Sequence, residues 1–94
     1  MEIVSIGHKG LKDYILEGKE KGLRQELIPR IRTIIAALEA AEDMDGVLGP
    51  PGWRIHQLKG DRAGDWSISV SGNWRLTFQM IERQIHFLEL EDYH

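Results

Sequence analysis

The chain has 94 residues, 41% of them apolar, which is enough for one compact domain to bury a core without outside staples. It contains no cysteine, which excludes disulfides and thiolate metal sites and fits a reducing compartment. Its formal net charge of -3 argues against a protein that binds nucleic acid through overall positive charge.

No part of the sequence has the pattern of a targeting or membrane segment. The N-terminus, "MEIVSIGHKGLKDY", lacks an apolar run of signal-peptide length. The longest apolar-rich stretch, residues 31–41, includes Arg32 and Glu39 and is too short to span a bilayer. There are no repeats or linkers, so we expect a single domain over residues 1–94, a cytoplasmic location and no membrane partner.

The first half of the chain favours a short strand and two helices. Residues 1–6 alternate weakly, and residues 8–20 then carry apolar side chains at the three-and-four spacing of an amphipathic helix, with Gly22 after them. A second helix is expected from near Glu26, with Pro29 in its first turn. The apolar positions that predict it are Leu27, Ile31, Ile34, Ile35, Leu38 and Ala41.

After the loop "EDMDGVLGPPGW" the apolar period changes to two, which is typical of strands. The pattern predicts strands at residues 53–58, 66–71, 74–80 and 85–90, with hairpin turns at "SGN" and at Glu82 and Arg83. This order indicates an α+β fold in which two N-terminal helices pack on an antiparallel sheet, to which the N-terminal strand is added.

The alternation also predicts which side chains share a face of the sheet. If Trp74, Leu76 and Phe78 point toward the helices, then Arg75, Thr77 and Gln79 line the opposite face. By the same period, His86 lies on one face and Glu89 and Glu91 on the other. These three residues therefore should not converge on a metal ion, and we expect no metal site.

Other site types find little support in the sequence. Alternating serines at 67, 69 and 71 lack a nucleophile elbow, and "KGDRAGD" lacks the spacing of a phosphate loop, so no cofactor is expected. A metal-free set of acid and base candidates remains, and it is suited to cleavage of RNA by its own 2′-hydroxyl. Each member alone also has a purely structural reading. The set comprises His56, Lys59, His86, Asp92, Tyr93 and His94.

The segment "IHQLKGDRAGDWSISVSGNWRLTF", followed at the end of the sequence by "LEDYH", resembles the RelE/ParE superfamily of bacterial type II toxins, and within it the HigB-like branch. "HKGLK" at residues 8–12 is similar to the N-terminus of that branch. The likeness spans nearly the whole chain, with several motifs in the same order and spacing. It implies a RelE-like microbial RNase fold.

The resemblance further implies a ribosome-dependent endoribonuclease that cuts the mRNA codon in the A site of the 70S ribosome, without a cofactor. It implies catalytic roles for a first set of residues, His56, Asp92, Tyr93 and His94. It implies substrate contacts for a second set, Lys59, Asn73 and Arg75. It also implies a HigA-like antitoxin with a helix-turn-helix region, through which alone the toxin would meet operator DNA.

A second reading stays open on the sequence. The ParE branch resembles non-catalytic toxins that poison gyrase, and a chain could also persist as an inactive antitoxin-binding domain. The terminal Asp-Tyr-His together with His56 favours the enzyme, because ParE-type chains lack this constellation.

Overall fold

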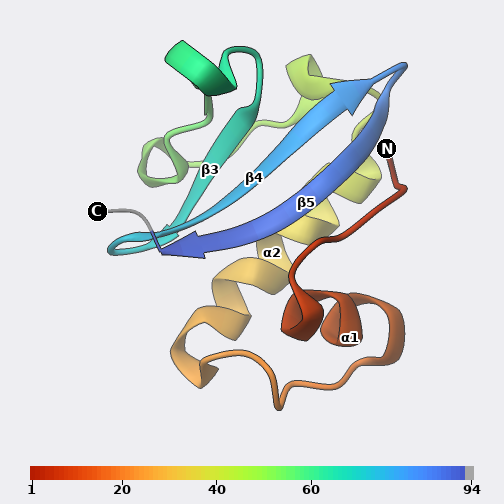
Figure 1. The fold of residues 1–94 in the computed structure, drawn as a ribbon, viewed down its shortest axis with the longest axis vertical. Coiled ribbons are helices and arrows are strands. Elements are labelled where there is room, and N and C mark those ends of the chain that lie inside the picture. Colours follow the sequence, from red (N-terminus) through yellow and green to blue (C-terminus); the bar gives the residue numbers. More distant parts are fainter. Residues whose placement is uncertain (93–94) are drawn as a thin grey trace.

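The computed structural model describes residues 1–92, which form a five-stranded sheet with two helices (Figure 1). The helices are α1 (Lys9–Glu17) and α2 (Ile28–Ala40). The strands are β1 (Glu2–Ile3), β2 (His56–Gln57), β3 (Trp66–Ser71), β4 (Trp74–Ile81) and β5 (Gln84–Asp92). Short 3-10 turns occur at Gln25–Leu27, Met44–Gly46, Pro51–Trp53 and Gly60–Arg62.

The predicted α+β class is confirmed, but the two helices do not begin the chain. The strand order is β1-β5-β4-β3-β2, in which β1 runs parallel to β5 and the other pairs are antiparallel. Glu2 pairs with Gln84 and Ile3 with Ile85, so the chain enters the sheet before it forms any helix. The helices therefore lie in the sequence between β1 and the other four strands.

Local signals explain where the helices begin and end. The Nδ1 atom of His8 accepts a hydrogen bond from the backbone N–H of Leu11 and caps α1. Gly18, in the left-handed region at φ 73°, ends the helix earlier than the predicted residue 20. Pro29 lies in the first turn of α2, as predicted, because a proline there costs no intrahelical hydrogen bond.

The strand predicted at residues 53–58 is much shorter in the structure. Only His56 and Gln57 pair with β3, opposite Ser67 and Trp66. Pro51–Trp53 instead forms a 3-10 turn, and Arg54 adopts a left-handed conformation at φ 49°. Proline favours such a turn start, and a residue at positive φ interrupts an extended chain. The predicted hairpins at residues 71–73 and 82–83 are confirmed.

The helices lie on one side of the sheet, and neither α1 nor α2 covers its other face (Figure 1). The core joins the apolar faces of helices and strands, with side chains such as Leu11, Leu38, Ile68, Leu76 and Phe78 at 0–1% exposure. Trp74 and Met80 pack against this core, as the alternation predicted. Arg75, Thr77 and Gln79 consequently point to the opposite face of β4, which we call the open face.

One irregularity in β5 overturns the predicted placement of His86. Gln79 pairs with His86 and Thr77 with Glu89, so the three residues 77–79 of β4 lie opposite the four residues 86–89 of β5. The extra residue is Phe87, at φ 54°. The bulge shifts the period, and His86, Glu89 and Glu91 all lie on the open face. They still do not gather: within residues 1–92, no three His, Asp or Glu side chains are placed to hold a metal ion.

A search of residues 1–92 for a helix long and apolar enough to cross a membrane finds none.

Candidate active site

A small cleft lies where β2, β3 and the start of β4 meet. Its volume is about 80 Å³, and it brings together His56, Asn73 and Arg75. These three were predicted as site residues from positions up to 19 apart in sequence. The remaining lining residues are Arg54, Ser67, Ser69, Gly72 and Trp74. The open face of the sheet thus carries an imidazole, a guanidinium and an amide within one hollow.

The ring of His56 is oriented by its own backbone neighbourhood. Its Nδ1 atom is hydrogen-bonded to the backbone carbonyl oxygen of Arg54. A carbonyl oxygen can only accept a hydrogen bond, so Nδ1 carries the proton and the neutral ring keeps a lone pair on Nε2. The left-handed turn at Arg54 is what brings that carbonyl back toward the ring of the residue two positions later.

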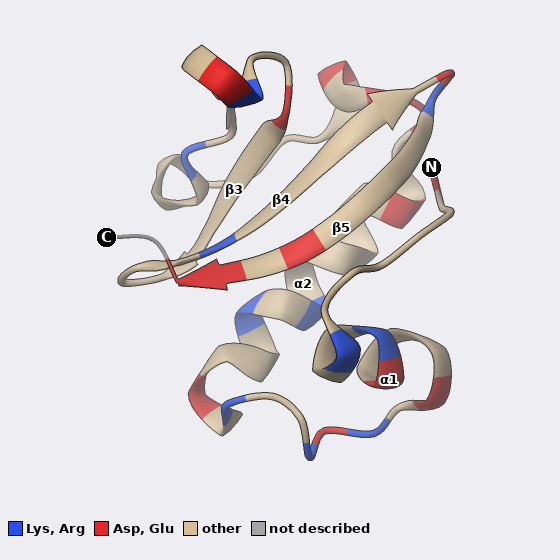
Figure 2. Cartoon of the chain, in the orientation of Figure 1, with Lys and Arg blue, Asp and Glu red and all other residues tan. Residues whose placement is uncertain are grey.

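Arg75 reaches the cleft from the second position of β4. It pairs in register with Ser69 of β3 and Glu91 of β5, so both neighbouring strands hold its backbone. Its side chain is only 17% exposed, and its Nη2 atom lies 3.4 Å from Oε1 of Glu91. Figure 2 shows a basic band near the start of β4 and acidic bands on β5.

The other predicted site residues stand in different relations to the cleft. Asp92 ends β5 directly opposite Trp74, a residue of the cleft wall. Lys59 is exposed at the start of the turn Gly60–Arg62 and does not line the cleft. Tyr93 and His94 lie outside the described residues.

Several residues at or near the cleft were not selected from the sequence as site residues. Arg54 lines it, and the guanidinium of Arg24 stacks 5.6 Å from the ring centroid of Trp74. Arg62 folds back over the open face and binds Glu91. The sequence carried no signal for these contacts, because a charge or an aromatic ring alone does not indicate its partner far along the chain.

The Glu91 carboxylate has an unusually low pKa. The hydrogen bonds from Arg62 lower that pKa from 4.5 to about 2, against the opposing effect of burial and with help from the Thr77 hydroxyl. The same ion pair raises the pKa of Arg62. Both groups are therefore charged throughout the neutral range, and neither is a proton-transfer group there.

Glu91 should make the fold acid-sensitive. Since its pKa is lower in the folded chain than in the unfolded one, its stabilisation is complete above about pH 4.5 and is lost as the pH falls toward 2. The shift corresponds to at most about 3 kcal/mol, and to less because the Arg62 side chain is 41% exposed. Thermal unfolding measured at pH 6 and pH 3 should show that the Glu91→Gln variant loses less stability between the two pH values than the wild type does.

Glu42→Gln, at an exposed position, is the matched control, and its loss of stability between pH 6 and pH 3 should equal that of the wild type. A Glu91→Gln variant as acid-sensitive as the wild type would assign the loss to other carboxylates.

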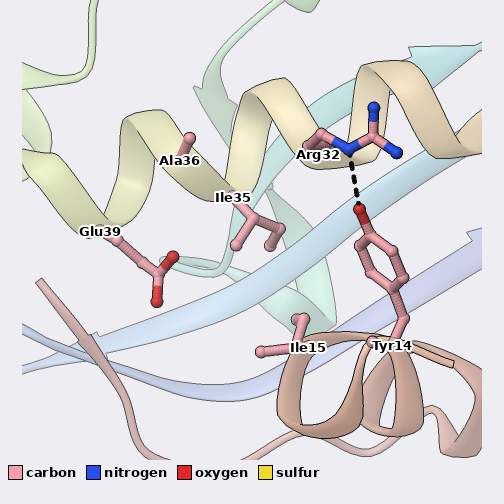
Figure 3. Close-up of a pocket in the computed structure, with 7 residues that line it drawn as sticks. Tyr14, Ile15, Arg32, Ile35, Ala36 and Glu39 are labelled. Carbon is pink, nitrogen blue, oxygen red and sulfur yellow. Dashed lines mark hydrogen bonds between the residues drawn. The ribbon is translucent and has the colours of Figure 1, made fainter.

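A larger cavity of about 300 Å³ lies between the two helices (Figure 3). Its walls are mainly apolar, with Ile15, Ile35 and Ala36 among them, and Tyr14 accepts a hydrogen bond from Nε of Arg32 at 3.2 Å. Glu39 lines the cavity without an imidazole beside it. No acid and base pair for hydrolysis is assembled there, so the smaller cleft is the candidate active site.

The chain is similar to known proteins in sequence and in fold. The family model described as "RelE-like toxin of type II toxin-antitoxin system HigB" matches residues 4–94. The chain is 41% identical over 92 residues to the endoribonuclease HigB of Proteus vulgaris, covering 98% of this chain and 99% of that protein.

Two solved structures share the fold. A histidine-to-glutamine mutant of YafQ from E. coli superposes with a TM-score of 0.63 at 15% identity, and YafQ from E. coli strain BL21(DE3) with 0.56 at 13% identity. Each comparison covers 98% of this chain and 93% of the other.

Proposed function

The chain belongs to the HigB-like family of RelE-like toxins of type II toxin-antitoxin systems, and from this premise we propose that it is an endoribonuclease that cuts mRNA in the ribosomal A site. The observation that carries the proposal is the cleft in which the Nε2 lone pair of His56 and the guanidinium of Arg75 occur together. The identity to a named endoribonuclease supports the same chemistry.

In the proposed reaction His56 is the general base. Its Nε2 atom takes the proton of the 2′-hydroxyl, and the 2′-oxygen forms a bond to the adjacent phosphorus. The bond from phosphorus to the 5′-oxygen then breaks, and an acid protonates that oxygen. The products are a 2′,3′-cyclic phosphate and a 5′-hydroxyl. The hydrogen bond from Nδ1 to the Arg54 carbonyl supports this role, because it selects the neutral tautomer whose lone pair is on Nε2.

In the proposed reaction Arg75 contacts the scissile phosphate and Asn73 contacts the codon. Negative charge grows on the phosphate oxygens as the 2′-oxygen attacks, and a fixed guanidinium in a small cleft stabilises that charge. Asn73, at the exposed tip of the hairpin between β3 and β4, offers an amide that donates and accepts hydrogen bonds to a base or ribose.

We assign the remaining roles from the resemblance to the toxin family. Tyr93 or His94 supplies the acid for the 5′-oxygen, Asp92 orients its neighbours, and Lys59 adds a cation to the scissile phosphate. The pairing of Asp92 with Trp74 supports the role of Asp92, because it holds this residue opposite a residue of the cleft wall. Lys59 would have to reach the phosphate from outside the cleft, since it is not among the lining residues.

Two observations support presentation of the mRNA by the ribosome. The cleft holds about 80 Å³, enough for a phosphate group but well below the roughly 300 Å³ of a pocket that encloses a small ligand. The net charge of -3 also disfavours tight binding of free RNA. Both observations therefore support a codon that the ribosome holds in place.

The toxin-antitoxin family implies an antitoxin partner. We propose that this partner is HigA-like, with a helix-turn-helix region that carries the pair to operator DNA. We also propose that residues 1–94 act as one domain in the cytoplasm.

Cleavage mapping tests the function. End-labelled mRNA on programmed 70S ribosomes should be cut by the folded chain inside the A-site codon, and the same free mRNA should be cut at least 100-fold more slowly. Equal cleavage of free mRNA would remove the ribosome from the proposal. No cleavage of either substrate, together with trapped gyrase-DNA complexes, would favour the ParE-like reading.

A further inference from the structure

An ion-pair network covers part of the open face beside the cleft. Arg62 binds Glu91 through two parallel hydrogen bonds, Nη1 to Oε1 and Nη2 to Oε2, each 2.7 Å long. The Nη2 atom of Arg62 also donates to the Thr77 hydroxyl at 3.1 Å, and its Nε atom lies 3.3 Å from Oδ2 of Asp65. One guanidinium thereby ties its own loop to β4 and β5.

This contact differs from an ordinary surface salt bridge. A bidentate arginine-carboxylate pair is shorter and more directional than a pair of point charges. Thr77 beneath it is 1% exposed, and the Glu91 side chain is 26% exposed. The network is therefore partly shielded from water, and an ion pair there contributes more to stability than one on a fully exposed surface.

Glu91 pairs with two arginines, and the distances show that Arg62 is the closer partner. Oε1 of Glu91 accepts from Nη1 of Arg62 at 2.7 Å and from Nη2 of Arg75 at 3.4 Å. Arg75 is the cation at the wall of the cleft. A carboxylate that paired fully with Arg75 would neutralise its charge and draw its side chain toward β5, and the close contact with Arg62 opposes that pairing.

The network also connects two segments that carry predicted site residues. Arg62 follows Lys59 by three positions, and Glu91 immediately precedes Asp92. The ion pair of Arg62 and Glu91, residues 29 positions apart, therefore joins the loop after β2 to the end of β5.

We propose that Arg62 is a positioning residue for RNA cleavage: by binding Glu91 it limits the hold of that carboxylate on Arg75 and keeps the Arg75 guanidinium directed to the scissile phosphate. The inference rests on the proposed endoribonuclease function. Arg62 itself touches no reacting atom, and it acts through Glu91 and Arg75.

Arg62→Gln and the double variant Arg62→Gln/Glu91→Gln provide the kinetic test. In the single variant Glu91 can pair fully with Arg75, so kcat on programmed ribosomes should fall about 10- to 100-fold. KM should change less than about twofold, because the lost contact is one made in the transition state. The double variant removes the competing carboxylate and should regain most of the lost kcat. Glu91→Gln alone should stay within about threefold of the wild type.

A purely structural role predicts a different pattern. Both Arg62→Gln and the double variant would then unfold at lower temperature, and kcat per folded molecule would be unchanged or would fall further in the double variant. Either of these results would overturn the proposal.

A second readout does not depend on cleavage. In NMR spectra of the arginine side chains, exchange of the Arg75 guanidinium protons should slow in Arg62→Gln, because Glu91 pairs more tightly with them, and should return to the wild-type rate or above in the double variant. Unchanged proton exchange of Arg75 in Arg62→Gln would overturn the proposed effect of Arg62 on Arg75, even if the wild type cleaves RNA. Slowed exchange in a chain that cuts no RNA would instead keep the coupling and reject the proposed function.

Discussion

The His56→Ala variant is expected to cut A-site codons about 10²- to 10⁴-fold more slowly than the wild type, the range typical for loss of a general base. The effect should fall mainly on kcat, because the ring removes a proton in the transition state and contributes little to holding the ribosome. His56 is exposed on a two-residue strand, so the alanine variant should fold. Single-turnover cleavage on programmed ribosomes, with circular dichroism as a check on folding, measures the effect.

A matched control comes from the same sheet. His86 lies on the open face too, but it pairs with Gln79 far along β4 from the cleft. His86→Gln should therefore leave the cleavage rate near that of the wild type. A His56→Ala variant that retains wild-type kcat would show that His56 is not the general base. Tyr93 and His94 would then have to supply both the base and the acid.

The Arg75→Ala variant should lose about 10²- to 10³-fold in kcat, comparable to removal of one donor from a site that stabilises an anionic transition state. The physical reason is its position: the Arg75 side chain is 17% exposed, its strand is held between β3 and β5, and it lines the cleft of about 80 Å³ in which we propose that the phosphate binds. Loss of cleavage should exceed loss of ribosome binding, measured in parallel by filter retention.

Arg75→Lys should recover only part of the rate, because an ammonium lacks the planar fork of a guanidinium. Arg30→Ala, at an exposed position of α2, removes the same charge away from the cleft and should cleave normally. Equal losses of binding and cleavage in Arg75→Ala would make Arg75 an anchor for RNA and remove it from the transition state.

Much of the secondary structure was predictable because it depends on neighbours in the sequence. The alternation of Trp74, Leu76 and Phe78 with polar residues predicted both a strand and its buried face, and burial agrees. The turn at Glu82 and Arg83 was likewise predicted, although neither residue is a glycine and both adopt positive φ. Here the two flanking strands impose the turn.

Predictions failed where a single residue changed a regular pattern. Phe87, as a bulge in β5, moves Glu89 and Glu91 to the face of His86, and a strict period of two cannot anticipate an inserted residue. The left-handed turn at Arg54 shortens β2 in the same way, and it also supplies the carbonyl that orients His56. Phe87 lies within β5, which ends at the candidate residue Asp92, and Arg54 lies two residues before the candidate residue His56 of β2.

The sequence by itself determined the α+β class, the faces of β3 and β4, and the toxin family, because apolar periodicity and ordered motifs are local properties of the chain. Only the tertiary structure decided that His56, Asn73 and Arg75 share one cleft and that Arg62 binds Glu91. These contacts join residues far apart in sequence, and their geometry depends on strand register and on the packing of a loop against the sheet. Neither is encoded in the spacing of the residues involved.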